Sequence, residues 1–187
     1  TSSTFYRLID TVSVSPVSAS GGFGSISFSI NPGLPSGLAF NSSNGRISGI
    51  ASQLSSQVHT ITATDSLGQT SGKNYSLTIT YSPLTTTLAV ASTVATRGKP
   101  ITSFTPVTSA GGSGSTTFSI GPSLPAGLSF NVSTGQVSGT PSESIVESTF
   151  TVTATDSQAN TSSKSFLLTV NIPAAIVTTA TTASVTL

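Results

Sequence analysis

The chain has 187 residues, of which 6% are charged, and its formal net charge is +1. Ordinary globular proteins have about 25% charged residues. Nucleic acid binding needs a concentrated basic patch, which six scattered Lys and Arg residues do not supply. Cysteine is absent, which excludes disulfides and thiolate metal sites. No apolar run approaches the ~18–20 residues of a membrane span, so we expect neither a nucleic acid partner nor a membrane-spanning segment.

Most of the chain is written twice, with an offset of about 90 residues. The tetrapeptide GGFG at 21–24 returns as GGSG at 111–114, and LPSGLAFN at 34–41 returns as LPAGLSFN at 124–131. A period of this length fits one small domain per copy. Two similar copies also do not suit a single asymmetric active site, so the pattern favours a structural or binding array.

In chain order, turn signals alternate with short segments of period two. Glycine and proline mark turns near 21–22, 32–37, 44–45 and 67–68, and at the corresponding places of the second copy. In the second copy we predict strands near 84–91, 101–107, 115–120, 127–131, 136–139, 148–156 and 162–170. Their alternation predicts inward side chains on the last two strands, namely Phe150, Val152, Ala154, Phe166, Leu168 and Val170.

Short strands bounded by turns, with no helical spacing, predict an all-β protein made of two tandem Ig-like β-sandwich domains. We place the first domain at 1–82, apparently without its first strand, and the second at 83–172. A further C-terminal strand is expected at 173–187. The aromatic residues Phe130 and Phe166 are expected in the core of the second domain.

The second copy carries the motifs LPxGLxF at 124–130, GxxxG at 135–139 and FTVTATD at 150–156. In this order the chain resembles the bacterial "putative Ig" repeat family, which is related to the dystroglycan-type cadherin-like domains. The resemblance covers nearly all of 84–171 and most of 8–81. The first copy departs from it at Ile50 and Ala51, where the family has Thr-Pro. It implies a cadherin-like sandwich from extracellular, repetitive microbial proteins, and no common catalytic residues.

The residues give no support for catalysis. His59 is the only histidine, and its counterpart in the second copy is Phe150, so we expect a partly buried packing residue. No carboxylates are paired for acid–base work, and the glycines at 22–24 and 112–114 precede no helix that could bind phosphate. We therefore expect no enzyme and no cofactor.

Asp65 and Asp156 are the best metal candidates, because both end a strand in the Ala-Thr-Asp context that the cadherin-like resemblance links to calcium. Calcium takes 6–8 oxygen ligands, usually with several carboxylates, whereas the chain has five acidic residues in total. The sequence favours side-chain capping of a turn, with a contact to Lys73 or Lys164 across the hairpin.

Four Asn-x-Ser/Thr sequons are candidates for glycosylation, at Asn41, Asn74, Asn131 and Asn160. Asn41 and Asn131 occupy equivalent positions ahead of Gly45 and Gly135. Turn chemistry alone explains an asparagine there, and sequons arise by chance in a Ser-rich chain, so both interpretations stay open.

The two copies differ in which segments they contain at their N-terminal and C-terminal ends. The first copy has no equivalent of 84–90, while the tail after Val170 occupies the place that 81–90 occupies after the first copy. Either the chain is an excerpt of a longer array, or the tail completes the first domain of a neighbouring subunit by strand donation. The apolar residues of such an assembly strand are Ile176, Val177, Ala183, Val185 and Leu187.

These observations predict a structural subunit or segment of an extracellular microbial surface fibre, pilus-like filament or adhesin stalk, assembled head to tail from copies of itself or from adjacent repeats. The alternatives are a spacer or carbohydrate-binding module of a secreted hydrolase, and an Ig-like appendage of a phage virion. A carbohydrate-binding module calls for an exposed aromatic platform, and the chain has no Trp and three scattered Tyr residues.

Overall fold

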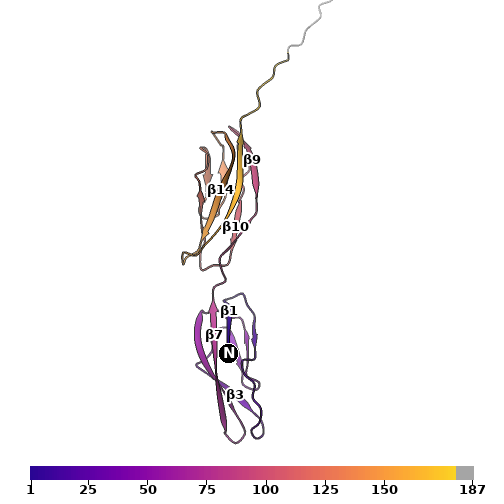
Figure 1. Ribbon diagram of the computed structural model, residues 1–187, viewed down its shortest axis with the longest axis vertical. Coiled ribbons are helices and arrows are strands. Elements are labelled where there is room, and N and C mark those ends of the chain that lie inside the picture. Colours follow the sequence, from indigo (N-terminus) through magenta and orange to yellow (C-terminus); the bar gives the residue numbers. More distant parts are fainter. Residues whose placement is uncertain (180–187) are drawn as a thin grey trace, which may run out of the picture. The chain divides into compact units, whose positions relative to one another are not determined.

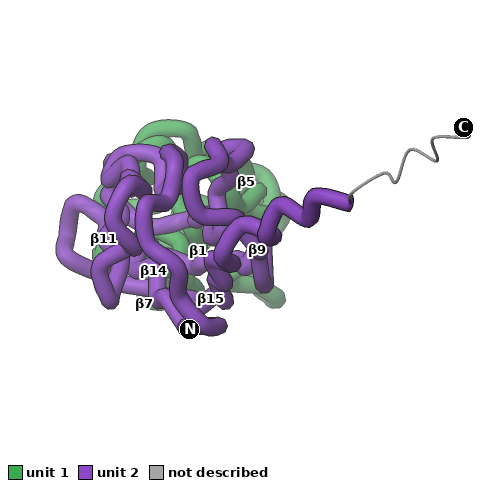
Figure 2. Tube along the Cα trace, turned by 90° about the horizontal axis from the view of Figure 1, so that it is seen from above, with its two compact units in different colours: residues 1–83 green, residues 84–187 purple. Residues whose placement is uncertain are grey.

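The computed structural model describes residues 1–179, and over that range it consists of strands, turns and loops (Figure 1). Residues 1–179 contain no helix that is long and apolar enough to cross a membrane. The chain divides into two compact units, unit 1 (Thr1–Pro83) and unit 2 (Leu84–Leu187), shown in different colours in Figure 2. The prediction of an all-β protein built from β-sandwiches is confirmed.

Unit 1 contains a large sheet with the strand order β1-β7-β6-β3 and a smaller sheet with the order β2-β5-β4. Its strands are β1 (Ser2–Tyr6), β2 (Val12–Val14), β3 (Ser27–Asn31), β4 (Leu38–Asn41), β5 (Arg46–Gly49), β6 (Ser55–Thr64) and β7 (Thr70–Thr80). The first and last strands, β1 and β7, lie side by side and run parallel. The other neighbouring strands are antiparallel.

Unit 2 repeats most of this plan, with two strands that unit 1 lacks and only an isolated bridge at Phe104 in the place of β2. Its large sheet has the order β11-β14-β15-β9, and two smaller sheets are formed by β8 with β10 and by β12 with β13. The strands are β8 (Thr85–Leu88), β9 (Ser92–Thr96), β10 (Val107–Ala110), β11 (Thr117–Gly121), β12 (Leu128–Phe130), β13 (Val137–Gly139), β14 (Ile145–Thr155) and β15 (Thr161–Asn171). As in unit 1, the strands β9 and β15 are parallel. The two strands without a counterpart in unit 1 are β8 and β10, which pair antiparallel with each other.

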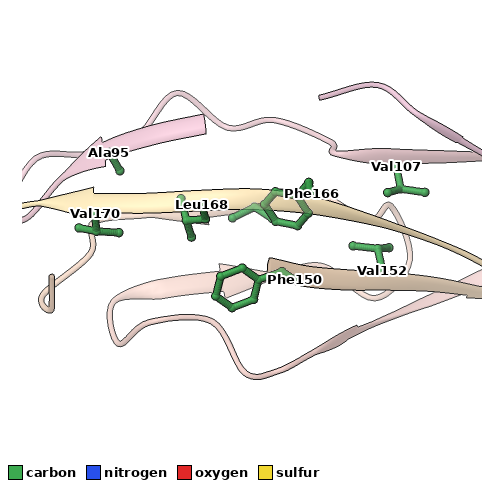
Figure 3. Close-up of a cluster of buried hydrophobic side chains, with 8 residues drawn as sticks. Ala95, Val107, Phe150, Val152, Phe166, Leu168 and Val170 are labelled. Atoms are coloured by element: carbon green, nitrogen blue, oxygen red, sulfur yellow. The ribbon is translucent and has the colours of Figure 1, made fainter. Parts of the chain in front are cut away.

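Each unit has its own hydrophobic core, built from the inward residues of its long strands. Figure 3 shows Phe166, Leu168 and Val170 in a row along β15, with Phe150 and Val152 beside them on β14. All six side chains predicted to face inward in unit 2 are buried. Complete burial of a Val, Leu or Phe side chain contributes about 1.5–3 kcal/mol, so these inward residues contribute substantially to the stability of unit 2.

The LPxGLxF motif has a steric basis in a turn that faces another backbone segment. Gly127 has φ 87°, a conformation that favours glycine, and a Cβ on it would collide with the carbonyl oxygen of Thr140. The amide of Thr140 donates a hydrogen bond of 2.9 Å to the carbonyl of Gly127. Gly37 repeats this arrangement in unit 1, with φ 89° and the carbonyl of Ile50 in the colliding position.

Two of the strand predictions for unit 2 are wrong. The segment predicted as a strand at 101–107 contains only an isolated bridge between Phe104 and Val137, and β10 begins where it should have ended. Its apolar residues recur every third position, whereas a strand with one buried face needs them every second. The strand predicted at 84–91 ends at Leu88 and is followed by β9, so the described part of unit 2 has eight strands rather than seven.

The tail begins after β15. Residues 172–179 form no strand and are exposed, including Ile176 and Val177. The other predicted assembly residues, Ala183, Val185 and Leu187, lie outside the described residues. A strand over 173–187 that pairs with a different sandwich therefore stays a prediction.

Candidate functional site

Asp156 closes the hairpin between β14 and β15. Its Oδ1 accepts hydrogen bonds of 2.9 Å from the amides of Gln158 and Asn160, so the carboxylate caps its own turn. Its Oδ2 accepts 2.9 Å from the amide of Ser113 and 3.0 Å from the side-chain amide of Asn160. The contact with Ser113 spans 43 residues, so the turn is fastened to the loop that carries the GGSG motif.

Asp65 makes the same arrangement in unit 1. Its Oδ1 accepts 2.9 Å from the amides of Leu67 and Gln69, and its Oδ2 accepts 2.9 Å from the amide of Phe23 and 3.3 Å from the side chain of Gln69. The second glycine of the GGFG motif, Gly22, leaves room for this carboxylate, because a Cβ there would lie 3.1 Å from Oδ2. The loop with the repeated glycine tetrapeptide therefore makes room for the aspartate of the hairpin and donates a hydrogen bond to it. We call each set of hydrogen bonds, namely Asp65 with residues 23, 67 and 69 and Asp156 with residues 113, 158 and 160, an aspartate staple.

These hydrogen bonds favour the ionised carboxylates. The pKa of Asp156 is lowered from 3.8 to about 2, mainly by the side-chain amide of Asn160. The pKa of Asp65 is also lowered, with the amide of Phe23 as the largest cause. An ionised carboxylate is a stronger hydrogen-bond acceptor than a protonated one. The hydrogen bonds of each staple are therefore strongest at pH values above the ordinary pKa of an aspartate.

Hydrogen bonds occupy the acceptor positions of both aspartate carboxylates. Each carboxylate already accepts four hydrogen bonds, which matches its roughly four lone-pair sites. All the donors are N–H groups of the turn or the glycine loop, and neither Lys73 nor Lys164 is among them. Within residues 1–179, no three His, Cys, Asp or Glu side chains cluster. Calcium binding would need these bonds to break and further oxygen ligands to be found.

His59 is fully buried rather than partly buried as predicted. Its Nδ1 lies 2.7 Å from the carbonyl oxygen of Pro32, so Nδ1 carries the proton and donates. Its Nε2 has no hydrogen-bond partner among the described residues, and neither does the hydroxyl of Tyr75, the residue opposite it on β7. The one hydrogen bond that the structure gives the imidazole among the described residues is thus to a backbone carbonyl.

The four sequon asparagines are all exposed. The side-chain oxygens of Asn41 and Asn131 each cap a turn, accepting 2.9 Å from the amides of Ser43 and Ser133. This leaves the side-chain nitrogens, which would carry a glycan, free of that role. Asn160 differs, because its side-chain nitrogen is part of the staple with Asp156.

The two units differ most in one side of the sandwich, which β8 covers in unit 2 and which no strand covers among residues 1–83 of unit 1. Thr86 on β8 is buried, and its hydroxyl lies 2.9 Å from the hydroxyl of Ser162 on β15. Leu84, just ahead of β8, sits over Gly112 of the glycine loop. Under this cover Val107, Ala154 and Asp156 are all buried.

Unit 1 has no strand in the place of β8 among residues 1–83. In unit 1, the residues that correspond to those beneath β8 are more exposed than they are in unit 2. We call these residues of unit 1 the open flank: Val17, Ala19, Ala63, Asp65 and Ser71. Ala63 is only partly buried, whereas its counterpart Ala154 is fully buried beneath β8.

Two hollows follow the open flank. One of about 220 Å³ is lined by residues that include Ala19, Gly22, Ala63 and Ser71. The other, of about 240 Å³, has Val17, Phe28 and Ile61 in its wall together with Ala19, Ala63 and Ser71. Each is smaller than the roughly 300–1,000 Å³ of a typical small-molecule pocket. The sequence pattern predicted that the first copy lacks a strand, but it gave no indication that hollows would lie along the open flank.

Comparison with known proteins places these features in context. The "Serine-rich adhesin for platelets" of Staphylococcus aureus is 26% identical over 134 residues, which is 72% of this chain. The chain spans only 6% of that adhesin. Among solved structures, the titin domains z1z2 in complex with telethonin match with a TM-score of 0.51 and 14% identity over 92% of each chain. Mouse cadherin-23 EC22-24 matches over 92% of this chain and 62% of its own, with 19% identity and a TM-score of 0.44.

Both units also match one sequence family. The family described as "Putative Ig domain" matches residues 1–80 and again 82–171. These matches contain the LPxGLxF turn, the glycine tetrapeptide and the aspartate staple of each unit. The chain therefore belongs to the family of "Putative Ig domain" repeats.

Proposed function

We propose that the chain is a load-bearing segment of an extracellular microbial surface protein, either an adhesin stalk or a filament, in which Ig-like repeats are joined head to tail. Its role is to hold and extend other parts of an assembly, and it is not catalytic. β-Strand donation between copies is part of this proposal.

The observation that carries the proposal is the parallel pairing of a strand near the start of each unit with the last long strand of that unit. In unit 1, β1 runs parallel to β7, with Ser2 opposite Ser76 and Tyr6 opposite Thr80. A pull on the two ends of the unit then draws β1 and β7 in opposite directions along their shared axis. All the hydrogen bonds between them resist together, instead of opening one after another. β9 and β15 give unit 2 the same geometry.

Surface chemistry and similarity support the extracellular setting. The outward positions of the long strands carry mostly hydroxyls and few charges, as in the Thr residues that alternate along β14. The staphylococcal relative is described as an adhesin for platelets. Only a small part of that protein is matched, so its ligand is not carried over. A carbohydrate platform gains no support, since Tyr75 is buried and Phe23 stands alone as an exposed phenylalanine.

Single-molecule stretching tests the mechanical role. The chain has no cysteine, so handles can be attached at introduced ones. Ser2→Cys with Ser82→Cys loads β1 and β7 in shear. Ser2→Cys with Ser76→Cys pulls on two directly opposed residues at one end of the pair, across the strands, so the hydrogen bonds open one after another. We expect a clearly higher unfolding force for the first pair of handles. Equal forces would show that the parallel strands do not bear load and would contradict the proposal.

A further inference from the structure

A third hollow lies beside β9 in unit 2, and it is larger than the two along the open flank. Its volume is about 370 Å³, at the lower end of the roughly 300–1,000 Å³ of typical ligand pockets. All the residues that line it lie between positions 93 and 168 of the chain. The polar part of the lining consists of three threonines and Lys99, and the apolar part consists of Val94, Ala95, Pro100, Ile101, Phe104 and Leu168.

The hollow lies where unit 2 has a small residue in the place of a large one. Ala95 of β9 is opposite Val170, just as Phe5 of β1 is opposite the equivalent Ile79. Phe5 is partly buried and packs against the core of unit 1. Figure 3 shows the short side chain of Ala95 beside β15. Larger residues than in unit 1 at positions 101 and 104 fill part of the space, and the hollow is what they leave open.

β9 also has an unpaired edge. Among the described residues, its only strand neighbour is β15. The amide of Arg97, directly after β9, donates a hydrogen bond of 2.9 Å to the carbonyl of Asn171, so the odd-numbered residues direct their backbone groups to β15. The backbone groups of Ser92 and Val94 therefore point away from the sheet. Such an edge accepts an added strand, and a pocket beside it selects one side chain of that strand.

Lys99 gives the hollow a positive charge. It is the one charged residue that the described chain contributes to the lining. Its amide donates 3.1 Å to the carbonyl of Thr96, and the amide of Gly98 donates 2.8 Å to the carbonyl of Pro141, so a hydrogen-bonded turn holds Lys99 beside the hollow. A carboxylate next to an apolar group complements this combination of charge and apolar surface. Unit 1 has Ile9 at the equivalent position.

We propose that unit 2 binds an extended segment of a partner protein along the free edge of β9. One aromatic side chain of the segment enters the hollow, in the space that Phe5 takes up in unit 1, and a carboxylate of the segment lies against Lys99. This binding site goes beyond the load-bearing role and does not depend on it, because the pairing of β9 with β15 stays intact.

A designed peptide tests the site. The probe is Thr-Asp-Thr-Phe-Thr-Asp-Thr, blocked at both ends and labelled with a fluorophore. Its alternation places the phenylalanine and both aspartates on one face of a strand. Fluorescence anisotropy follows its titration with the full 187-residue chain at low salt. We expect saturable binding, and binding at least about tenfold weaker when the phenylalanine is replaced by serine or both aspartates by lysine.

Three chain variants locate the bound peptide. Ala95→Phe introduces the residue of unit 1 and fills the hollow, and Val94→Pro removes an outward N–H from the edge. Each should weaken binding at least about tenfold. Lys99→Glu should weaken binding of the acidic peptide and strengthen binding of the peptide with lysines, an exchange that loss of structure cannot produce. The matched control is Lys164→Glu, an exposed charge on β15 outside the lining, which should leave this preference unchanged.

Several results would overturn the proposal. The unaltered chain might show no saturable binding, or Ala95→Phe and Val94→Pro might bind like the unaltered chain. If Ala95→Phe lowers the thermal midpoint of unit 2, the exchange of preference by Lys99→Glu decides, and its absence refutes the site. Equally tight binding of 3-phenylpropionate would show a pocket for a small aromatic acid instead of a strand site. Self-association of the unaltered chain that Ala95→Phe abolishes would replace the partner protein by a second copy. None of these results would affect the load-bearing role, which stretching measures separately.

Discussion

Truncation of Phe166 to alanine tests the assignment of inward faces most quantitatively. Phe166 is 1% exposed. Its ring lies edge-on to Phe104 at 5.9 Å between centroids, and 5.8 Å from Phe150. Loss of a buried phenylalanine costs about 3–5 kcal/mol, and each aromatic contact adds about 0.5–1.5 kcal/mol beyond burial. We therefore expect the upper part of this range, against a total stability of about 5–15 kcal/mol for a domain of this size.

The assay exploits the uneven distribution of aromatic residues. All three tyrosines, Tyr6, Tyr75 and Tyr81, lie in unit 1, and the chain has no tryptophan. Tyrosine fluorescence thus reports the unfolding of unit 1, while circular dichroism reports both units. Phe166→Ala should lower the midpoint of one circular dichroism transition by roughly 12–40 °C. The tyrosine transition should stay in place, because the two core clusters share no residue.

The control is Ser163→Ala, which changes an exposed side chain of β15 on the face opposite to the core. It should shift the transition by no more than about 0.5 kcal/mol. A loss below about 1 kcal/mol for Phe166→Ala would show that the inward and outward faces of β15 are reversed. An equal shift of the tyrosine transition would contradict the separation of the cores.

Three further predictions concern the staple, metal dependence and the glycine turn. Since the pKa of Asp156 falls from 3.8 to about 2 on folding, its stabilisation is complete above its unfolded pKa and is lost as the pH drops from 3.8 towards 2. The thermal midpoint of unit 2 should decline across that interval, and Asp156→Asn should flatten the decline; an unchanged slope would rule out the staple as its cause. Calcium and chelator should give the same midpoint, because both carboxylates are saturated by N–H donors, and a drop of more than about 5 °C with chelator would refute this. Gly37→Ala should destabilise unit 1 by more than about 2 kcal/mol because of its φ of 89° and the facing carbonyl of Ile50. Gly33→Ala, where a Cβ meets open space, is the matched control, and similar losses for both would remove the steric explanation of the LPxGLxF turn.

The sequence predicted the long strands well because their signal is local. Alternation of Phe150, Val152 and Ala154 with threonines follows directly from the two-residue period of a strand, and all three are buried. β9 was missed because it turns only Ala95 fully into the core. Its parallel pairing with β15 links residues about 75 positions apart, and no local pattern reports such a pairing.

The candidate site was less predictable because its contacts are long-range. A turn role for Asp65 and Asp156 was foreseen from their place at a strand end. Their hydrogen bonds to Phe23 and Ser113 were not, because each joins loops more than 40 residues apart. The repeated glycine tetrapeptide could have indicated these hydrogen bonds, because its loop contains Phe23 in unit 1 and Ser113 in unit 2. Phe130, expected in the core, is only partly buried against it, since it lies on the short strand β12.

The location of the native protein tests the central claim most directly. Antibodies raised against the 187-residue chain would be used for immunogold electron microscopy of intact cells of the producing organism. We predict gold particles on the outer surface, in rows along fibres or stalks. Label that appears only inside sectioned cells, with intact cells unlabelled, would contradict a load-bearing role in an extracellular surface protein.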